Sequence, residues 1–205
     1  MIKVKICGIT TLADAMLAVD AGADALGFIF VEDTPRFVTP AVAGSIIRAL
    51  PPFVTPVGVF WNHAAGHVKS VAESCGLGAL QFHGDEAPED LAGYVQPVIK
   101  TVKVGGAADL ERLDAYTVSA FLLDSRERWS EGEARQPISW QLARAAAAHG
   151  RIILSAGLTP ANVADAIAVA RPYGVDVNSG VEASPGRKDP VKVREFVAAA
   201  RRASG

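Results

Sequence analysis

The chain has 205 residues, half of them hydrophobic, and 20 basic against 22 acidic side chains give it a net charge of −2. This length suits one domain with a well-buried core, so we expect a single domain over residues 1–205. The even charge argues against a nucleic-acid partner, and no apolar run is long enough for a membrane span. With no signal-peptide pattern at the N-terminus, we expect a cytoplasmic protein.

Short apolar runs alternate with longer, alanine-rich amphipathic runs along the chain. The short runs predict eight strands at 4–7, 25–30, 56–60, 79–83, 98–102, 120–124, 152–155 and 175–178. Helix starts are predicted where a capping side chain precedes the first turn, at Thr11, Thr39-Pro40, Thr159-Pro160 and Asp189-Pro190. Strands alternating with helices pair in parallel through right-handed crossovers.

Eight such units predict the α/β class, as a single-domain (β/α)₈ (TIM) barrel. The main alternative is an open, doubly wound sheet. That fold normally shows a glycine-rich dinucleotide turn after its first strand, and Cys7-Gly8-Ile9-Thr10 is not such a turn.

Two side chains at predicted strand ends are candidates for acid–base chemistry. Cys7 ends the first strand before a glycine, with Lys5 on its own face; a nearby cation favours the thiolate, unless an inward carboxylate such as Asp176 neutralises Lys5. Asp124 ends the sixth strand and is a candidate general acid. The structural alternatives are an apolar filler for Cys7 and a helix cap or arginine partner for Asp124. Cys75, at helical spacing before Gly76, is expected to be such a filler.

Small residues follow the last two strands, in Ser155-Ala156-Gly157-Leu158 and Asn178-Ser179-Gly180. Phosphate sites in these barrels commonly lie after strands seven and eight, so the pair of turns predicts a phosphate site there. The alternative is that the glycines only shape the turns.

Three loop features remain. Arg36, after the second strand, has a planar fork suited to a carboxylate. His83, after the fourth strand, either donates a hydrogen bond or completes a turn. The charged stretch 125–135, after the sixth strand, is either a solvated excursion or a lid over the active face.

Taken together, these segments resemble the phosphoribosylanthranilate isomerases nearly end to end. The matching segments, in order, are Lys5-Ile6-Cys7-Gly8-Ile9-Thr10, Gly27-Phe28-Ile29-Phe30, Pro35-Arg36, Val57-Gly58-Val59-Phe60, Gln81-Phe82-His83-Gly84, Leu122-Leu123-Asp124, Ser155-Ala156-Gly157-Leu158, Gly174-Val175-Asp176-Val177-Asn178-Ser179-Gly180-Val181-Glu182 and Pro185-Gly186-Arg187-Lys188-Asp189.

The resemblance implies an Amadori rearrangement of an aldose-amine in tryptophan biosynthesis, with no metal or organic cofactor. It implies Cys7 as general base and Asp124 as general acid. It also implies that Arg36 binds the anthranilate carboxylate, and that Gly157, Ser179 and Gly180 hold the phosphate. With His83 these form the expected substrate site, and the expected partner is this small phosphorylated substrate alone, bound by a monomer or homodimer.

The chain departs from the family pattern near the site. The usual Gly-Gly-x-Gly run after the acid is replaced by Glu131-Gly132-Glu133-Ala134-Arg135, and the following Phe-Asp-Trp by Ile138-Ser139-Trp140. Ala156 replaces a glycine that is usual in the family, and Asn178 replaces a usual serine. Trp61 follows the third strand at a position where a smaller residue is common. Two alternative hypotheses for the function stay open. The chain is either similar in function to the related two-aspartate isomerase of histidine synthesis, or a non-catalytic phosphate-ligand binder descended from the isomerase.

Overall fold

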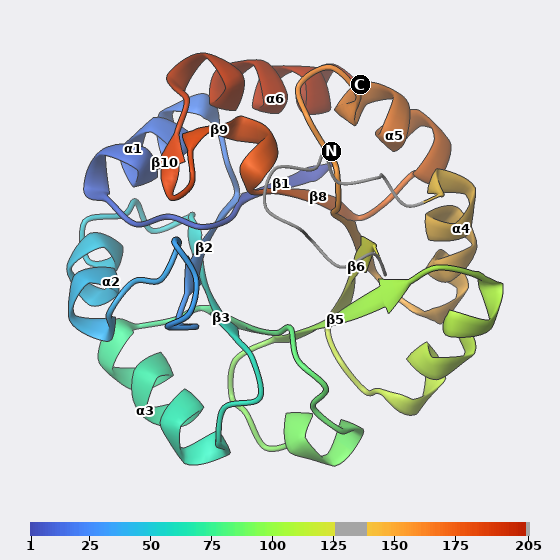
Figure 1. Ribbon diagram of the computed structural model, residues 1–205, viewed down its shortest axis with the longest axis horizontal. Coiled ribbons are helices and arrows are strands. Elements are labelled where there is room, and N and C mark those ends of the chain that lie inside the picture. Colours follow the sequence, from blue (N-terminus) through green and yellow to red (C-terminus); the bar gives the residue numbers. More distant parts are fainter. Residues whose placement is uncertain (126–138, 204–205) are drawn as a thin grey trace.

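The structure is a computed structural model that describes residues 1–125 and 139–203. Eight parallel strands form a closed barrel in chain order, each hydrogen-bonded to the next and the eighth to the first (Figure 1). The strands are β1 (Lys3–Ile6), β2 (Ala25–Ile29), β3 (Thr55–Phe60), β4 (Ala79–Phe82), β5 (Val98–Val104), β6 (Ala120–Ser125), β7 (Ile152–Leu154) and β8 (Gly174–Val177). The predicted (β/α)₈ barrel is confirmed, and every predicted strand overlaps an observed one.

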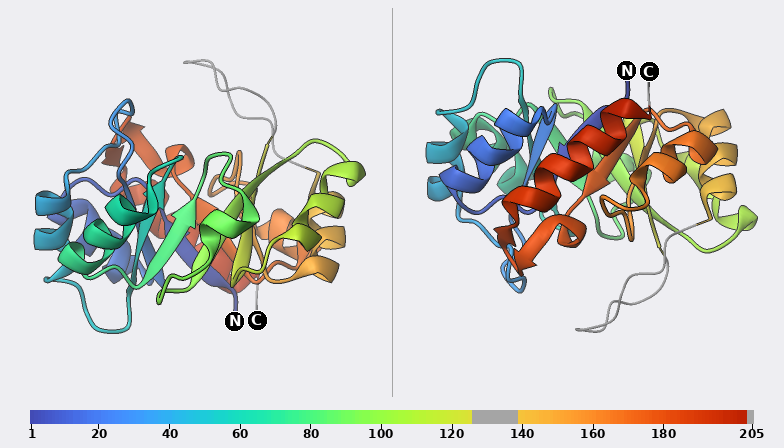
Figure 2. Two further views of the ribbon diagram at one scale, coloured as in Figure 1. Left: turned by 90° about the horizontal axis from the view of Figure 1, so that it is seen from below. Right: turned by 90° about the horizontal axis from the view of Figure 1, so that it is seen from above.

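Helices surround the barrel (Figure 1), and the side views in Figure 2 show them along its outer wall. They are α1 (Leu12–Ala21), α2 (Pro40–Ile47), α3 (Ala65–Cys75), α4 (Trp140–Ala145), α5 (Val163–Ala170) and α6 (Pro190–Arg202). Short 3₁₀ turns are η1 (Pro88–Leu91), η2 (Ala107–Asp109), η3 (Glu111–Ala115), η4 (Ala146–His149) and η5 (Ser179–Val181). A small antiparallel pair, β9 (Glu182–Ser184) and β10 (Arg187–Lys188), lies between β8 and α6. No helix in the described parts of the chain is long and apolar enough to cross a membrane.

Three of the four predicted helix caps are confirmed. The side chains of Thr11, Thr39 and Asp189 each accept a backbone N–H from the first turn of α1, α2 and α6. The prediction at Thr159-Pro160 is wrong, because α5 begins only at Val163. The Asn162 side chain accepts from the Thr159 N–H at 2.8 Å and donates to the Gly157 carbonyl at 2.9 Å, which holds this segment as a turn instead.

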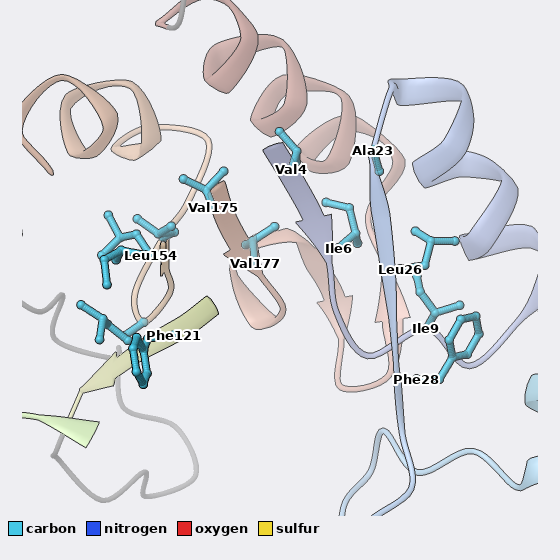
Figure 3. Packing of buried hydrophobic residues seen from close by; sticks show 14 of the residues in the cluster. Val4, Ile6, Ile9, Ala23, Leu26, Phe28, Phe121, Leu154, Val175 and Val177 are labelled. Atoms are coloured by element: carbon cyan, nitrogen blue, oxygen red, sulfur yellow. The ribbon is translucent and has the colours of Figure 1, made fainter. Parts of the chain in front are cut away.

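The core has two layers, which follow from strand alternation. The larger layer joins strand side chains to helix residues, and part of it is drawn in Figure 3. The smaller layer comes from alternate positions of the strands and fills the barrel interior; it consists of Val57, Ala79, Ile99, Ala120, Leu122 and Ile153. Along β6, Phe121 and Leu123 belong to the outer layer and Leu122 to the inner one, which places Asp124 on the inward face.

Candidate active site

Cys7 lies just beyond the carboxyl end of β1, the end where barrel enzymes bind their ligands. Its backbone N–H donates to the Val177 carbonyl of β8 at 2.8 Å, and its side chain is buried. Glycine is needed on both sides of the thiol. A Cβ on Gly27 would lie 2.7 Å from the Cys7 Sγ, and Gly8 has a φ of +72°. Two glycines therefore shape the slot that holds the thiol.

The charges beneath Cys7 are paired. The Lys5 Nζ lies 2.8 Å from the Asp176 Oδ1, and both side chains are buried. Burial alone would lower the pKa of Lys5, but the Asp176 carboxylate and Cys7 together raise it. The pKa of Cys7 is raised above its ordinary value, because burial outweighs the opposing effect of the Lys5 cation. The charge of Lys5 is thus balanced by Asp176, which is the alternative that the sequence raises for this lysine. Lys5 also lowers the pKa of Cys7 and is in this sense coupled to it.

Asp124 is buried near the carboxyl end of β6, three strands from β1 around the barrel. Its Oδ1 accepts from the Ser125 backbone N–H at 2.9 Å. Its Oδ2 lies 3.5 Å from the Nε2 of His83, the residue that follows β4. The structure therefore brings two predicted site residues, Asp124 and His83, together.

The planar fork of Arg36 binds a carboxylate of the protein itself, whereas the resemblance implies that it binds the carboxylate of the substrate. Its Nε and Nη2 donate to the two carboxyl oxygens of Glu182 at 2.9 and 2.7 Å. Glu182 also accepts from Lys188, whose side chain is fully buried, at 3.1 Å. Burial would raise the pKa of Glu182, but the two cations more than offset this and lower it. Burial lowers the pKa of Lys188, although Glu182 opposes this effect.

Sequence reasoning missed the roles of Glu182 and Lys188. The signal in the sequence that could have indicated these roles is that Glu182 and Lys188 both lie in the short segment after the eighth strand. The partner of Glu182 lies 146 residues away, however, and no local pattern reveals it.

The two turns after β7 and β8 pack directly against each other. A Cβ on Gly180 would lie 2.0 Å from the Leu158 carbonyl oxygen, so only glycine fits there. Gly157 has a φ of +67°, and Ala156 beside it has a φ of +63°, a conformation that suits the glycine usual in the resembling family. Ser179 opens η5 within the second turn. The predicted phosphate-site residues therefore lie together.

One prediction falls almost wholly on other residues. The charged stretch 125–135 lies outside the described residues except for Ser125. Within residues 1–125 and 139–203, no group of three or more histidine, cysteine, aspartate and glutamate side chains is arranged to hold a metal ion.

A closed parallel barrel with a buried thiol, a buried carboxylate and adjoining small-residue turns at the carboxyl ends of its strands defines the class of (β/α)₈-barrel enzymes. Residues 4–199 match the family model described as N-(5'phosphoribosyl)anthranilate (PRA) isomerase. The chain belongs to this family of isomerases.

Individual relatives agree with this assignment. The chain is 54% identical to the N-(5'-phosphoribosyl)anthranilate isomerase of Pelobacter propionicus over 197 residues, covering 96% of this chain and 94% of the relative. A solved phosphoribosyl anthranilate isomerase in complex with reduced 1-(o-carboxyphenylamino)-1-deoxyribulose 5-phosphate is similar with a TM-score of 0.90 and 40% identity, covering 98% of this chain and 100% of that one. Monomers generated from the dimeric enzyme of Thermotoga maritima are similar with a TM-score of 0.88 and 38% identity, with the same coverage.

Proposed function

We propose that the protein isomerises N-(5'-phosphoribosyl)anthranilate to 1-(2-carboxyphenylamino)-1-deoxyribulose 5-phosphate in tryptophan biosynthesis, with Cys7 as the base and Asp124 as the acid. The observation that carries the proposal is the placement of these two groups in a chain of this family. Both side chains are buried and face the barrel interior, at the carboxyl ends of β1 and β6. An Amadori rearrangement needs this combination, an acid that carries a proton and a base that does not.

The acid acts first. Asp124 gives its proton to the ribose ring oxygen as the bond from that oxygen to C1′ breaks. The lone pair of the anthranilate nitrogen then forms the C1′=N bond of an open-chain Schiff base. Burial of the carboxyl group keeps water from competing for this proton.

The base acts second. The Cys7 thiolate removes the C2′ proton, and the electron pair of the broken C–H bond moves into the C1′–C2′ bond to give an enolamine. The enolamine tautomerises to the ketose product. Because the pKa of Cys7 is raised, the thiolate is a minor species at neutral pH and a strong base when it forms. The Lys5 cation, and to a smaller extent the Lys188 cation, favours the thiolate.

The remaining predicted residues bind the substrate in this proposal. Gly157, Ser179 and Gly180 offer backbone and hydroxyl donors to the phosphate. Arg36 binds the anthranilate carboxylate while Glu182 keeps its guanidinium oriented. His83 borders the site beside Asp124.

A direct assay tests the proposal. The purified protein is given N-(5'-phosphoribosyl)anthranilate, formed in situ, and the loss of the anthranilate fluorescence of the substrate is followed. We expect Cys7→Ala and Asp124→Asn each to lower kcat by on the order of 10²-fold or more while leaving thermal unfolding cooperative. Cys75→Ala is the matched control, because Cys75 is a second buried cysteine, in α3. Full activity of Cys7→Ala would refute the assigned mechanism.

The alternatives give different outcomes. Turnover of the aldose-amine precursor of histidine synthesis, which carries a second phosphate, would support the two-aspartate isomerase. Tight calorimetric binding of a reduced product analogue without turnover would support the non-catalytic binder.

We further propose that each chain forms one barrel domain over residues 1–205 and that two chains form a homodimer. We expect this dimer to be located in the cytoplasm. The dimeric state of the Thermotoga maritima relative supports the homodimer. So do two almost fully exposed apolar side chains, Phe53 before β3 and Val95 before β5, at the end of the barrel opposite the site. Sedimentation equilibrium tests the dimer, and Phe53→Asp is expected to weaken it.

A further inference from the structure

Trp61, which follows β3 directly, has no part in the reaction scheme above. Its ring stacks on that of His83, with 5.4 Å between the ring centroids and 24° between the planes. The side chain is 39% exposed, so removal from water does not by itself account for its position. The Lys103 Nζ lies 4.7 Å from the Trp61 ring centroid, a cation–π contact that adds to the hold on the indole. Trp61 is therefore fixed against a residue of the site by contacts on the surface of the barrel mouth.

The His83 imidazole has contacts at both ring nitrogens, in addition to the stack of its ring face on Trp61. The Gln81 Nε2 lies 3.5 Å from the His83 Nδ1 and 3.2 Å from the Thr101 Oγ1. The Gln81 amide lies with its NH₂ group toward Nδ1, and an NH₂ group can only donate, so the His83 tautomer that completes this contact carries its ring proton on Nε2. Nε2 is the atom that faces the Asp124 Oδ2, at 3.5 Å. Such contacts are often long without substrate and shorten in the working complex.

One buried ion pair joins the two loops that carry the stack. The Glu86 Oε1 accepts from the backbone N–H of Asn62 at 2.8 Å and of Gly84 at 3.2 Å, the residues next to Trp61 and His83. Its Oε2 accepts from the buried Lys100 Nζ at 2.7 Å. Burial would raise the pKa of Glu86, but Lys100 and the backbone donors lower it, so the carboxylate stays ionised at neutral pH. The loops after β3 and β4 are thus fixed to each other at the residues that adjoin Trp61 and His83.

We propose that Trp61 is a positioning residue for the reaction: its indole holds the His83 imidazole so that Nε2–H points at Asp124 and keeps that carboxyl group in the orientation that delivers its proton. The inference rests on the proposed role of Asp124 as the acid. The loss of the stack frees the ring to rotate, although Gln81 and Thr101 remain in place. The rate of proton delivery then falls, whereas substrate binding at the turns after β7 and β8 is unchanged.

Steady-state kinetics of Trp61→Ala, Trp61→Phe, His83→Ala and the double variant Trp61→Ala/His83→Ala test this. We expect Trp61→Ala to lower kcat about fivefold, the value of one stacked aromatic pair, with KM changed less than about twofold. Trp61→Phe keeps a ring face and is expected to retain kcat within about twofold. In the His83→Ala background, Trp61→Ala is expected to have no further effect beyond about twofold, because its action passes through His83.

Tyr173→Ala is the matched control. Tyr173 is also a partly exposed aromatic with a cation near its ring, Arg151 at 5.8 Å, but it lies before β8 at the other end of the barrel. We expect its kcat to match that of the wild type. Thermal unfolding of each variant shows whether the fold is intact, and Trp61→Leu replaces Trp61→Ala if the alanine variant is insoluble.

Two results would overturn the inference. Multiplicative losses in the double variant would show that Trp61 does not act through His83. A rise in KM at unchanged kcat would show that it contacts the substrate instead. Failure of the proposed acid role is distinguishable, because Asp124→Asn would then retain full activity whatever the Trp61 variants do. Failure of the proposed function is distinguishable as well, because the wild type would then show no turnover.

Discussion

Lys5→Met is the substitution whose effect the structure defines most closely. It removes the cation of a buried pair, leaving the Asp176 carboxylate without its partner at 2.8 Å. It also removes the cation that favours the Cys7 thiolate. One change is therefore expected to affect both the stability of the barrel and the pH dependence of its chemistry.

The magnitude follows from the distance. Two unit charges 2.8 Å apart attract by about 6 kcal/mol at an effective dielectric constant of about 20, before the desolvation of both is subtracted. Removing one partner of such a pair leaves a buried charge uncompensated, for which about 3–5 kcal/mol of lost stability is typical. Because the pKa of Lys5 is raised above 10.5, this stabilisation is fully present below about pH 10 and is lost only as the pH rises through the folded-state pKa.

Urea unfolding at pH 8 measures the loss of stability, and Lys3→Met is the matched control. Lys3 lies on the same strand and pairs with Asp24 at 3.0 Å, but its side chain is 54% exposed, so we expect a change below about 1 kcal/mol. The double variant Lys5→Met/Asp176→Leu, which buries no charge, is expected to recover most of the loss. A loss below about 1 kcal/mol in Lys5→Met would refute the argument. In Lys5→Met the Cys7 thiolate is expected to form at higher pH than in the wild type, because the cation that lowers the pKa of Cys7 is gone.

Three further predictions concern the site. Burial raises the pKa of Cys7 above 9.0, so the ultraviolet absorbance of its thiolate, taken as the difference between the wild type and Cys7→Ala, is expected to rise throughout pH 6 to 9.5; a plateau below pH 8 would contradict this. Gly180→Ala forces a Cβ to within 2.0 Å of a neighbouring carbonyl oxygen and is expected to raise KM by on the order of tenfold or more, whereas Gly66→Ala, with open space around it, leaves KM unchanged. The pKa of Glu182 is lowered, so its contribution to stability is present above about pH 4.5 and is lost as the pH falls through the folded-state pKa. Urea midpoints at pH 7 and pH 3.5 are therefore expected to differ less in Glu182→Gln than in the wild type.

The barrel itself could be predicted because each strand carries its own signal. Buried parallel strands are short apolar runs, and the helix caps at Thr11, Thr39 and Asp189 are local side-chain hydrogen bonds. The helix start predicted at Thr159 is wrong because the side chain of Asn162, three residues later, accepts the backbone N–H of Thr159 and holds the segment as a turn. The sequence alone does not rank two local hydrogen-bonding options of similar strength.

The site could be predicted as a set of strand ends but only partly as a set of contacts. Asp176 can be predicted as a partner for Lys5 because both side chains alternate inward, and the β1–β8 register places them side by side. The Arg36–Glu182 pair and the Trp61–His83 stack each join two loops. Their geometry depends on how those loops pack and not on strand periodicity, so no pattern in the chain reveals it.

The seam between β1 and β8 has a consequence for folding. Lys5 and Asp176 are 171 residues apart, and the backbone N–H of Cys7 is satisfied by Val177. These contacts are among the most distant in sequence that the chain makes, and closing so long a loop is slow because its entropy must be lost before the contacts form. The environment of the thiol is therefore completed only when the first and last barrel strands meet. In a refolding experiment, catalytic activity would report the closing of the barrel, whereas circular dichroism would report the earlier formation of its helices.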